Sequence, residues 1–144
     1  MSLVCLLYAS TISDNFEPDD IKHILSSAQR NNAKQHVTGM LSFNRKYFLQ
    51  CLEGAREHVN EIYHRIARDP RHHRLEVLDY QYVNKRSFSE WHMGYLQDTH
   101  TLSELFYKYS PSDQFDPYNM SPDGAFLLLQ DIKTEILNAL KESR

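Results

Sequence analysis

Short apolar runs alternate with longer amphipathic stretches over the first 96 residues, and this alternation restricts the fold more than any other feature of the chain. Five runs, at 3–8, 37–43, 47–52, 75–83 and 91–96, have the length and composition of β-strands. Two stretches between them repeat apolar residues every three or four positions, which is typical of a helix with one buried face. The order predicts an α+β ferredoxin-like sandwich (βαββαββ) with a mixed five-stranded sheet.

The two early helices have recognisable ends. Pro18, followed by two aspartates, is a favourable helix start, and we expect this helix to end near Asn31-Asn32. The second helix follows Gly54 and ends at Asp69-Pro70, because the residue before a proline is pushed out of helical geometry. Residues 44–46 join two strands as a hairpin turn.

The first and third apolar runs are apolar on both faces of the strands that they predict. In the first run, Leu6 and Tyr8 point to one face, whereas Cys5 and Leu7 point to the other. Both faces of the sheet should therefore be covered. The two early helices cover one face, and the other needs a second lid.

Residues 99–144 can supply this lid as a C-terminal helical extension of the region 1–98. Thr101–Tyr109 predicts a short helix, and Ser121-Pro122 predicts the start of a longer one. The long helix carries an apolar stripe of Ala125, Leu129, Ile132, Ile136 and Leu140.

Composition excludes several classes of protein. The 16 basic and 19 acidic residues form no long block of one sign, which argues against nucleic acid as a partner. No apolar stretch approaches the roughly 18 residues of a membrane span. Cys5 and Cys51 lie in apolar runs, so we expect both to be buried and reduced. With no secretory signal, this indicates a cytoplasmic location.

Two polar side chains lie in otherwise apolar strands. Tyr8 is in the first run, and Gln50 has apolar neighbours on both sides. A buried amide must find hydrogen-bond partners. Tyr8 and Gln50 therefore form either a structural hydrogen bond in the core or the polar edge of a ligand site between the helices.

Other candidate residues also have two interpretations. The Asn31-Asn32 pair is either a helix end, where asparagine tolerates left-handed geometry, or a carboxamide donor and acceptor for a heterocycle. The basic cluster at 65–73 is a solvated helix end or a rim for a phosphate or carbonyl group. Trp91 and Met93 share one face of the last strand and are either core residues or part of the site.

Motifs of common enzymes are absent from the sequence. There is no glycine-rich phosphate loop, no G-x-S-x-G and no H-E-x-x-H, and the histidines lack the spacing of a zinc site. We therefore expect neither an enzyme nor a metal protein.

Several motifs together resemble one known family, the BLUF domains, which sense blue light with a flavin. The resemblance to this family covers about residues 3–97. The spacing of Tyr8, Asn32, Gln50 and Met93, taken together, is specific to the family. The remainder of the chain is similar to short cyanobacterial BLUF proteins of the PixD type. The motifs are Leu6-Leu7-Tyr8-Ala9-Ser10, Asn31-Asn32, Val37-Thr38-Gly39-Met40-Leu41, Phe48-Leu49-Gln50-Cys51-Leu52-Glu53-Gly54, Asp69-Pro70-Arg71-His72-His73 and Trp91-x-Met93, then Lys108-Tyr109-Ser110, Phe115-x-Pro117 and Met120.

The resemblance implies a role for each candidate. Tyr8 donates an electron and a proton to the excited flavin, and Gln50 rearranges its hydrogen bonds between Tyr8 and the flavin. Trp91 and Met93 report this change through the last strand. His92, where serine is more usual, should point to the opposite face.

The resemblance also implies a cofactor, FAD or FMN, and the residues that hold it. Ile24 and Ile66 sandwich the ring from the two helices, and Asn31 and Asn32 contact its polar edge. The expected cofactor-binding residues are Ile24, Asn31, Asn32, Gln50, Arg65, Ile66 and Asp69.

The function implied is a photoreceptor without substrate turnover, with residues 1–98 as the flavin-binding photosensory domain. We expect a homo-oligomer that signals by contact with a separate response protein, without nucleic acid or membrane partners. Two alternatives remain: a ferredoxin-like regulatory domain for a small ligand, and a flavin-dependent oxidoreductase. The sequence has no dinucleotide-binding fingerprint to support the second.

Overall fold

Five strands form one mixed sheet in the order β4-β1-β3-β2-β5 within residues 2–96 and 99–143, the part of the chain that the computed structural model describes. The pair β2-β5 is parallel and the other neighbours are antiparallel. This confirms the predicted ferredoxin-like fold. The elements are β1 (Leu3–Ile12), α1 (Pro18–Lys34), β2 (Thr38–Phe43), β3 (Tyr47–Ala55), α2 (Arg56–Ala67), β4 (His72–Tyr82), β5 (Gly94–Tyr95), α3 (Thr99–Tyr107), the 3-10 helix η1 (Pro117–Asn119) and α4 (Pro122–Glu142).

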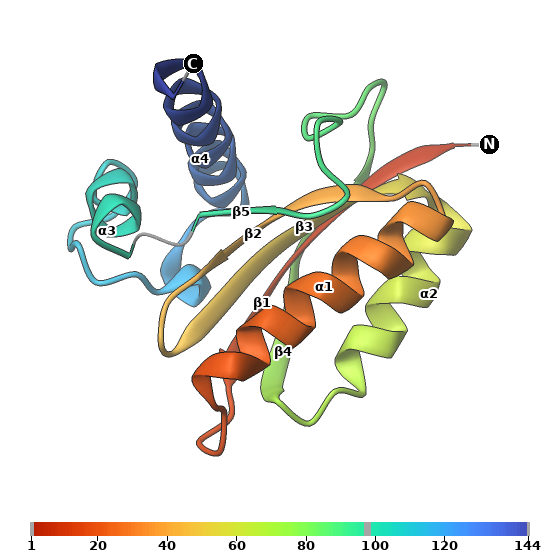
Figure 1. The fold of residues 1–144 in the computed structure, drawn as a ribbon, viewed down its shortest axis with the longest axis horizontal. Coiled ribbons are helices and arrows are strands. Elements are labelled where there is room, and N and C mark those ends of the chain that lie inside the picture. Colours follow the sequence, from red (N-terminus) through yellow and green to blue (C-terminus); the bar gives the residue numbers. More distant parts are fainter. Residues whose placement is uncertain (1, 97–98, 144) are drawn as a thin grey trace.

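Helices cover both faces of the sheet. Figure 1 shows α1 and α2 side by side on one face, and α3 and α4 on the other. Each face has its own apolar core, and the alternation of β1 divides its side chains between them as predicted. Leu6 and Tyr8 belong to the core under α1 and α2, whereas Cys5 and Leu7 belong to the core under α4.

Helix α1 begins at Pro18 as predicted, and the Asp20 carboxylate accepts a hydrogen bond from the Glu17 backbone at 2.8 Å. Its predicted end at Asn31-Asn32 is wrong, because Ala33 and Lys34, both good helix formers, continue the helix. His36 then takes the left-handed conformation, with φ of 55°. The two asparagines are therefore helical and are not needed for the turn.

Strand β5 is shorter than the predicted 91–96. Only Gly94–Tyr95 pairs with β2, and Trp91 and Met93 lie before it. In the segment before it, Gly39 N of β2 donates to the Trp91 carbonyl at 3.2 Å, and Asn32 Nδ2 of α1 donates to the His92 carbonyl at 2.8 Å. The expectation that Trp91 and Met93 share one face of a strand is wrong.

The C-terminal helices form the predicted lid. Ala125, Leu129 and Ile132 of α4 are completely buried against the sheet, and Ile136 packs at the margin. Leu140 is 51% exposed, so its expected place in the stripe is wrong. Helix α4 continues beyond the sheet at this point (Figure 1), and no described element lies there to cover it.

Polar contacts fasten the lid. The Tyr109 hydroxyl and the Lys108 ammonium group both donate to the Asp131 carboxylate of α4. At the other end, the Tyr118 hydroxyl donates to the Arg74 carbonyl at 2.8 Å and contacts Thr11 Oγ1 at 2.9 Å.

A membrane span requires a helix of sufficient length and hydropathy, and none of the helices of the described residues meets both requirements.

The contact between Tyr109 and Asp131 predicts a dependence of stability on alkaline pH. Burial and the carboxylate beside it raise the pKa of Tyr109 to about 12, above the value of 10.0 for an unperturbed tyrosine. The unfolded chain therefore loses this proton first, and the free energy of unfolding falls as pH rises from 10 to 12. Tyr109→Phe should make this fall shallower in urea titrations at successive pH values. Equal slopes for both proteins would contradict the assignment.

Candidate functional site

A cavity of about 280 Å³ lies between α1, α2 and the sheet. Its size is near the lower end of small-ligand sites, which span about 300–1,000 Å³. The structure brings eight of the predicted site residues to its walls: Tyr8, Ile24, Asn31, Asn32, Gln50, Arg65, Ile66 and Asp69.

Tyr8 and Gln50 are direct cross-strand partners on β1 and β3. Both are buried, and the Tyr8 hydroxyl donates a hydrogen bond to Gln50 Oε1. Gln50 Nε2 in turn donates to Met93 Sδ at 3.2 Å. Since an amide nitrogen carries two hydrogens, Gln50 can also donate to a ligand in the cavity.

Tyr8 is held as a neutral phenol. Burial raises its pKa far above the ordinary value, and the nearby Tyr63 and Asp69 raise it further. The Tyr63 ring meets the Tyr8 ring edge-on, with centroids 5.3 Å apart. Tyr8 therefore keeps its proton in the resting state, and any ionisation must accompany loss of an electron or a strong change of the site.

Asn32 is a structural residue as well as a wall of the cavity. It is 1% exposed, and its bond to the His92 carbonyl ties α1 to the segment that carries Met93. Gln29 Nε2 also reaches the Met93 carbonyl, at 3.4 Å. Asn31 lines the cavity and is only partly buried. Two adjacent asparagines thus have different surroundings.

Asn32→Ala should lower the free energy of unfolding by about 1–2 kcal/mol, because it removes the hydrogen bond from the buried Asn32 side chain to the His92 carbonyl. Asn31→Ala is the matched control, since no hydrogen bond holds its side chain among the bonds found in the described residues. We expect the control to change the urea midpoint by much less. An equal loss in both variants would contradict the structural role of Asn32.

The charged edge of the cavity differs from the prediction. Arg65 lies at the rim and pairs with Glu61 at 3.7 Å, with both side chains about half exposed. Asp69 instead pairs with Arg71, whose Nη2 lies 2.6 Å from Oδ2. Burial alone would raise the pKa of Asp69, but the hydrogen bonds from Arg71 outweigh burial and lower it. Arg71 also lines the cavity, and the sequence reasoning had not singled it out as a site residue.

His72 is a second lining residue that the prediction missed. The sequence left the basic cluster that contains it as either a solvated helix end or a rim of the site, and His72 is only 8% exposed. Its Nδ1 lies 2.8 Å from Ser10 Oγ and its Nε2 lies 2.7 Å from the Ile66 carbonyl. Because a carbonyl oxygen only accepts, Nε2 is the donor in the second contact. Strand β4 starts at His72, which pairs with Ile12 of β1, three residues before the predicted start at Leu75.

Met93 and Trp91 lie on different sides of the sheet. Met93 is 1% exposed and contacts Gln50 at the cavity end. Trp91 packs against the opposite core, under α4, and a side chain at Gly94 would collide with its ring at 2.9 Å. The structure therefore does not bring Trp91 to Gln50. The exposed His92 ring contacts the Val37 carbonyl at 3.0 Å and leaves Met93 in place.

The arrangement suits a flat aromatic ligand. Ile24 of α1 and Ile66 of α2 line the cavity from the two helices, so an apolar ring system fits between them. Amides and a phenol converge at one end and offer both donors and acceptors. These features match the ring of a flavin, which has two apolar faces and a polar edge.

A family model agrees with this geometry. Residues 3–94 match BLUF, described as sensors of blue light using FAD. The chain therefore belongs to the BLUF family of flavin-binding blue-light sensors.

Individual relatives place the chain further. It is 40% identical over 88 residues to the blue light- and temperature-regulated antirepressor BluF of Escherichia coli K12, covering 61% of this chain and 22% of that protein. The photo-activated state of BlsA superposes with a TM-score of 0.80 at 27% identity, covering 90% of this chain and 93% of BlsA. BlrP1 of Klebsiella pneumoniae, solved with FMN and cyclic diGMP, gives a TM-score of 0.63 at 32% identity, covering 68% of this chain and 26% of BlrP1.

The chain spans less than a quarter of the curated relatives that it matches, 22% of the antirepressor and 11% of a photoactivated adenylate cyclase subunit of Euglena gracilis. What it shares with them is the light-sensing region. The match leaves out most of each longer protein, so their activities are not assigned to this chain.

Proposed function

We propose that this chain is a cytoplasmic photoreceptor without substrate turnover, in which Tyr8 and Gln50 carry out the primary response to blue light. The observation that carries the proposal is the buried contact from the Tyr8 hydroxyl to Gln50 at the end of the cavity. A bound flavin absorbs the light and accepts one electron. Tyr8 supplies that electron, and its hydroxyl proton passes toward Gln50.

Gln50 then changes its hydrogen bonds. In the structure its oxygen accepts from Tyr8 and its nitrogen donates to Met93. An amide that rotates or shifts a proton exchanges donor for acceptor at both ends. Tyr8 regains its electron and proton, and Gln50 is left in a second arrangement. Met93 is the first protein group to meet this change, because its sulfur is the partner of Gln50 Nε2.

The cofactor that we propose is FAD or FMN. The cavity residues address the ring, and the cationic groups near its mouth, Arg65 and Arg71, suit a phosphate-bearing tail. The family description names FAD, whereas BlrP1 was solved with FMN, so both tails are compatible with this fold. We also propose that residues 99–144 resemble the C-terminal region of the short cyanobacterial BLUF proteins of the PixD type.

For output we propose contact with a separate response protein, from a homo-oligomer. Helix α4 supports this, since one face covers the sheet while Leu127 and Leu140 are 46% and 51% exposed. The segment with Trp91 and Met93 adjoins both the cavity and the core under α4. A change at Met93 therefore has a short physical route to the lid. A bistable element of this kind is what a light switch requires.

Binding of flavin is tested with the purified full chain and FAD, FMN or riboflavin, followed by quenching of flavin fluorescence. We expect stoichiometric binding of at least one phosphate-bearing flavin. Ile24→Asp should weaken binding by at least about tenfold, because a charge would be buried against the ring. Ile21→Asp, on the same helix and outside the cavity lining, is the control. Failure of every flavin to bind would favour the alternative of a regulatory domain for a colourless ligand.

A further inference from the structure

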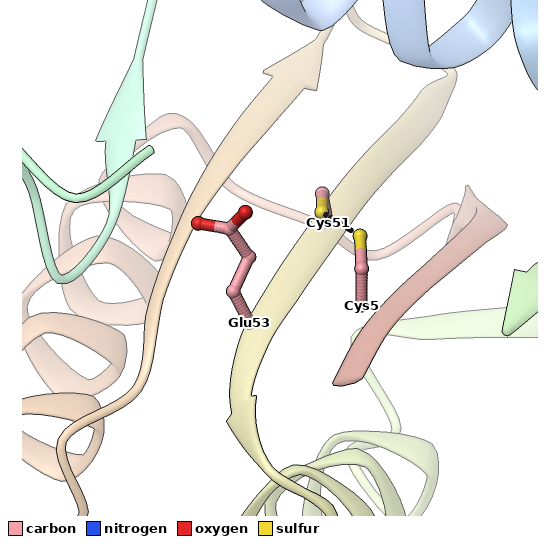
Figure 2. A group of neighbouring side chains, drawn as sticks. All are labelled: Cys5, Cys51 and Glu53. Atoms are coloured by element: carbon pink, nitrogen blue, oxygen red, sulfur yellow. Dashed lines mark hydrogen bonds between the residues drawn. The ribbon is translucent and has the colours of Figure 1, made fainter. Parts of the chain in front are cut away.

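Two cysteines face each other in the core under α4, away from the flavin cavity. Cys5 is on β1 and Cys51 on β3, and they are 5% and 0% exposed. The register pairs Cys5 with Glu53 and Leu7 with Cys51, so the two cysteines are diagonal neighbours on one face of the sheet. Figure 2 shows their sulfur atoms directed toward one another across the two strands.

The separation of the sulfur atoms is 2.8 Å. A disulfide requires about 2.05 Å, so bond formation needs an approach of about 0.8 Å. Each thiol is the other's hydrogen-bond partner, and the apolar core on this face surrounds both. The fold therefore holds the two sulfur atoms in contact, and closing the bond requires a shift of the two strands, because diagonal neighbours lie about 7–8 Å apart.

Glu53 lies beside the pair, and the three side chains have the composition of a metal site. Its carboxylate, however, is already used. Oε1 accepts from Phe88 N at 2.9 Å and Thr38 Oγ1 at 3.1 Å, and Oε2 accepts from Ser87 N at 2.6 Å. Three of the roughly four acceptor sites of this carboxylate are therefore occupied by protein donors, and the positions of both oxygens are fixed by them. The geometry favours a thiol pair over a metal centre.

We propose that Cys5 and Cys51 are a redox-responsive modification site, which a hydroperoxide converts to a reversible disulfide between β1 and β3. The Cys5 sulfur attacks one peroxide oxygen, the O–O bond breaks, and Cys5 becomes a sulfenic acid while one water or alcohol leaves. Cys51 then attacks the Cys5 sulfur, the S–O bond breaks, and the sulfenic hydroxyl leaves as water with the proton of the Cys51 thiol. The two thiols together lose two electrons and two protons, and the hydroperoxide is reduced.

The order of these steps follows from burial. Burial and the neighbouring Cys5 raise the pKa of the Cys51 thiol, and Cys5 is the more exposed of the two, so Cys5 is assigned the first attack and Cys51 loses its proton only in the second step. The disulfide would tie together the strands that carry Tyr8 and Gln50, which are themselves direct partners in the same ladder. The site thus lies behind the photochemical pair, on the opposite face of the same two strands.

The test uses the full chain, reduced and then exposed to hydrogen peroxide in the dark. After denaturation, remaining thiols are alkylated and the intact mass is measured. We expect a monomer that has lost two hydrogens and takes up no alkyl group, and dithiothreitol should reverse this. Because the bond joins residues 46 apart, oxidation should also raise Tm by on the order of 10 °C. Cys5→Ser and Cys51→Ser should give no such species.

Several results would overturn the proposal. Two thiols that remain fully alkylatable after peroxide treatment would show that the pair does not react. Disulfide-linked dimers in place of the internal bond would show that the partner thiol lies in another chain. Stoichiometric zinc that protects both thiols would assign the cluster to a metal. None of these readouts requires flavin or light, so they are independent of the proposed photochemistry.

Discussion

Blue light should shift the absorption of the bound flavin to the red, and Tyr8→Phe should abolish this shift while flavin stays bound. The variant keeps the ring and its packing but removes the hydroxyl that donates to Gln50. Without this group no proton can accompany the electron. Loss of one hydrogen bond at the site should change flavin affinity by less than about tenfold. Light-minus-dark absorption spectra of the two flavin-loaded proteins provide the measurement.

Tyr63→Phe is the matched control for this experiment. The two tyrosine rings are in edge-to-face contact, yet Tyr63 is on α2 and no hydrogen bond joins its hydroxyl to Gln50 among the bonds found in the described residues. Its variant should retain the red shift. Gln50→Leu should lose it, because leucine has no amide to rearrange. A normal photocycle in Tyr8→Phe would refute the role assigned to Tyr8.

Glu53→Ala should lower the free energy of unfolding by about 3 kcal/mol or more, the largest effect on stability that we expect from a single polar residue. Glu53 is 1% exposed and anchors the loop between β4 and β5 through the backbones of Ser87 and Phe88. Each buried donor left without a partner costs about 1–3 kcal/mol. Phe88, itself completely buried against Phe126 of α4, would lose its fixed position as well.

Urea unfolding measures this effect, with Glu57→Ala as the control. Glu57 is an exposed glutamate in the first turn of α2, so its removal should change stability by about 0.5 kcal/mol or less. If the two variants unfold at the same urea concentration, the Glu53 carboxylate does not anchor the loop.

Much of the fold follows from local patterns in the sequence. The alternation of β1 and β3 assigns each side chain to a face, and the demand for two lids follows from the apolar character of both faces. The proline starts of α1 and α4 were also predictable. Features that depend on contacts between distant residues were not predictable from the sequence. The late start of β5 follows a segment whose His92 carbonyl is bound by Asn32, about sixty residues away in the chain.

The candidate site shows the same division. Tyr8 and Gln50 stand out because each is a polar residue in an apolar strand, and their register brings them together. Arg71 and His72 did not stand out in the sequence, because a basic cluster after a helix is commonly solvated. His72 is buried beside Ser10 of the distant strand β1, and Arg71 is held by Asp69, two residues before it. Trp91 was misplaced because the sequence could not show that residues 91–93 leave the strand.

The absorption spectrum of the flavin-loaded chain before and after blue light tests the central claim most directly. The account predicts a yellow protein whose flavin bands shift to the red during illumination and return in the dark, without any added reductant or substrate. A flavin spectrum that stays unchanged under blue light, or that bleaches as the flavin is reduced and recovers only with an oxidant, would contradict it.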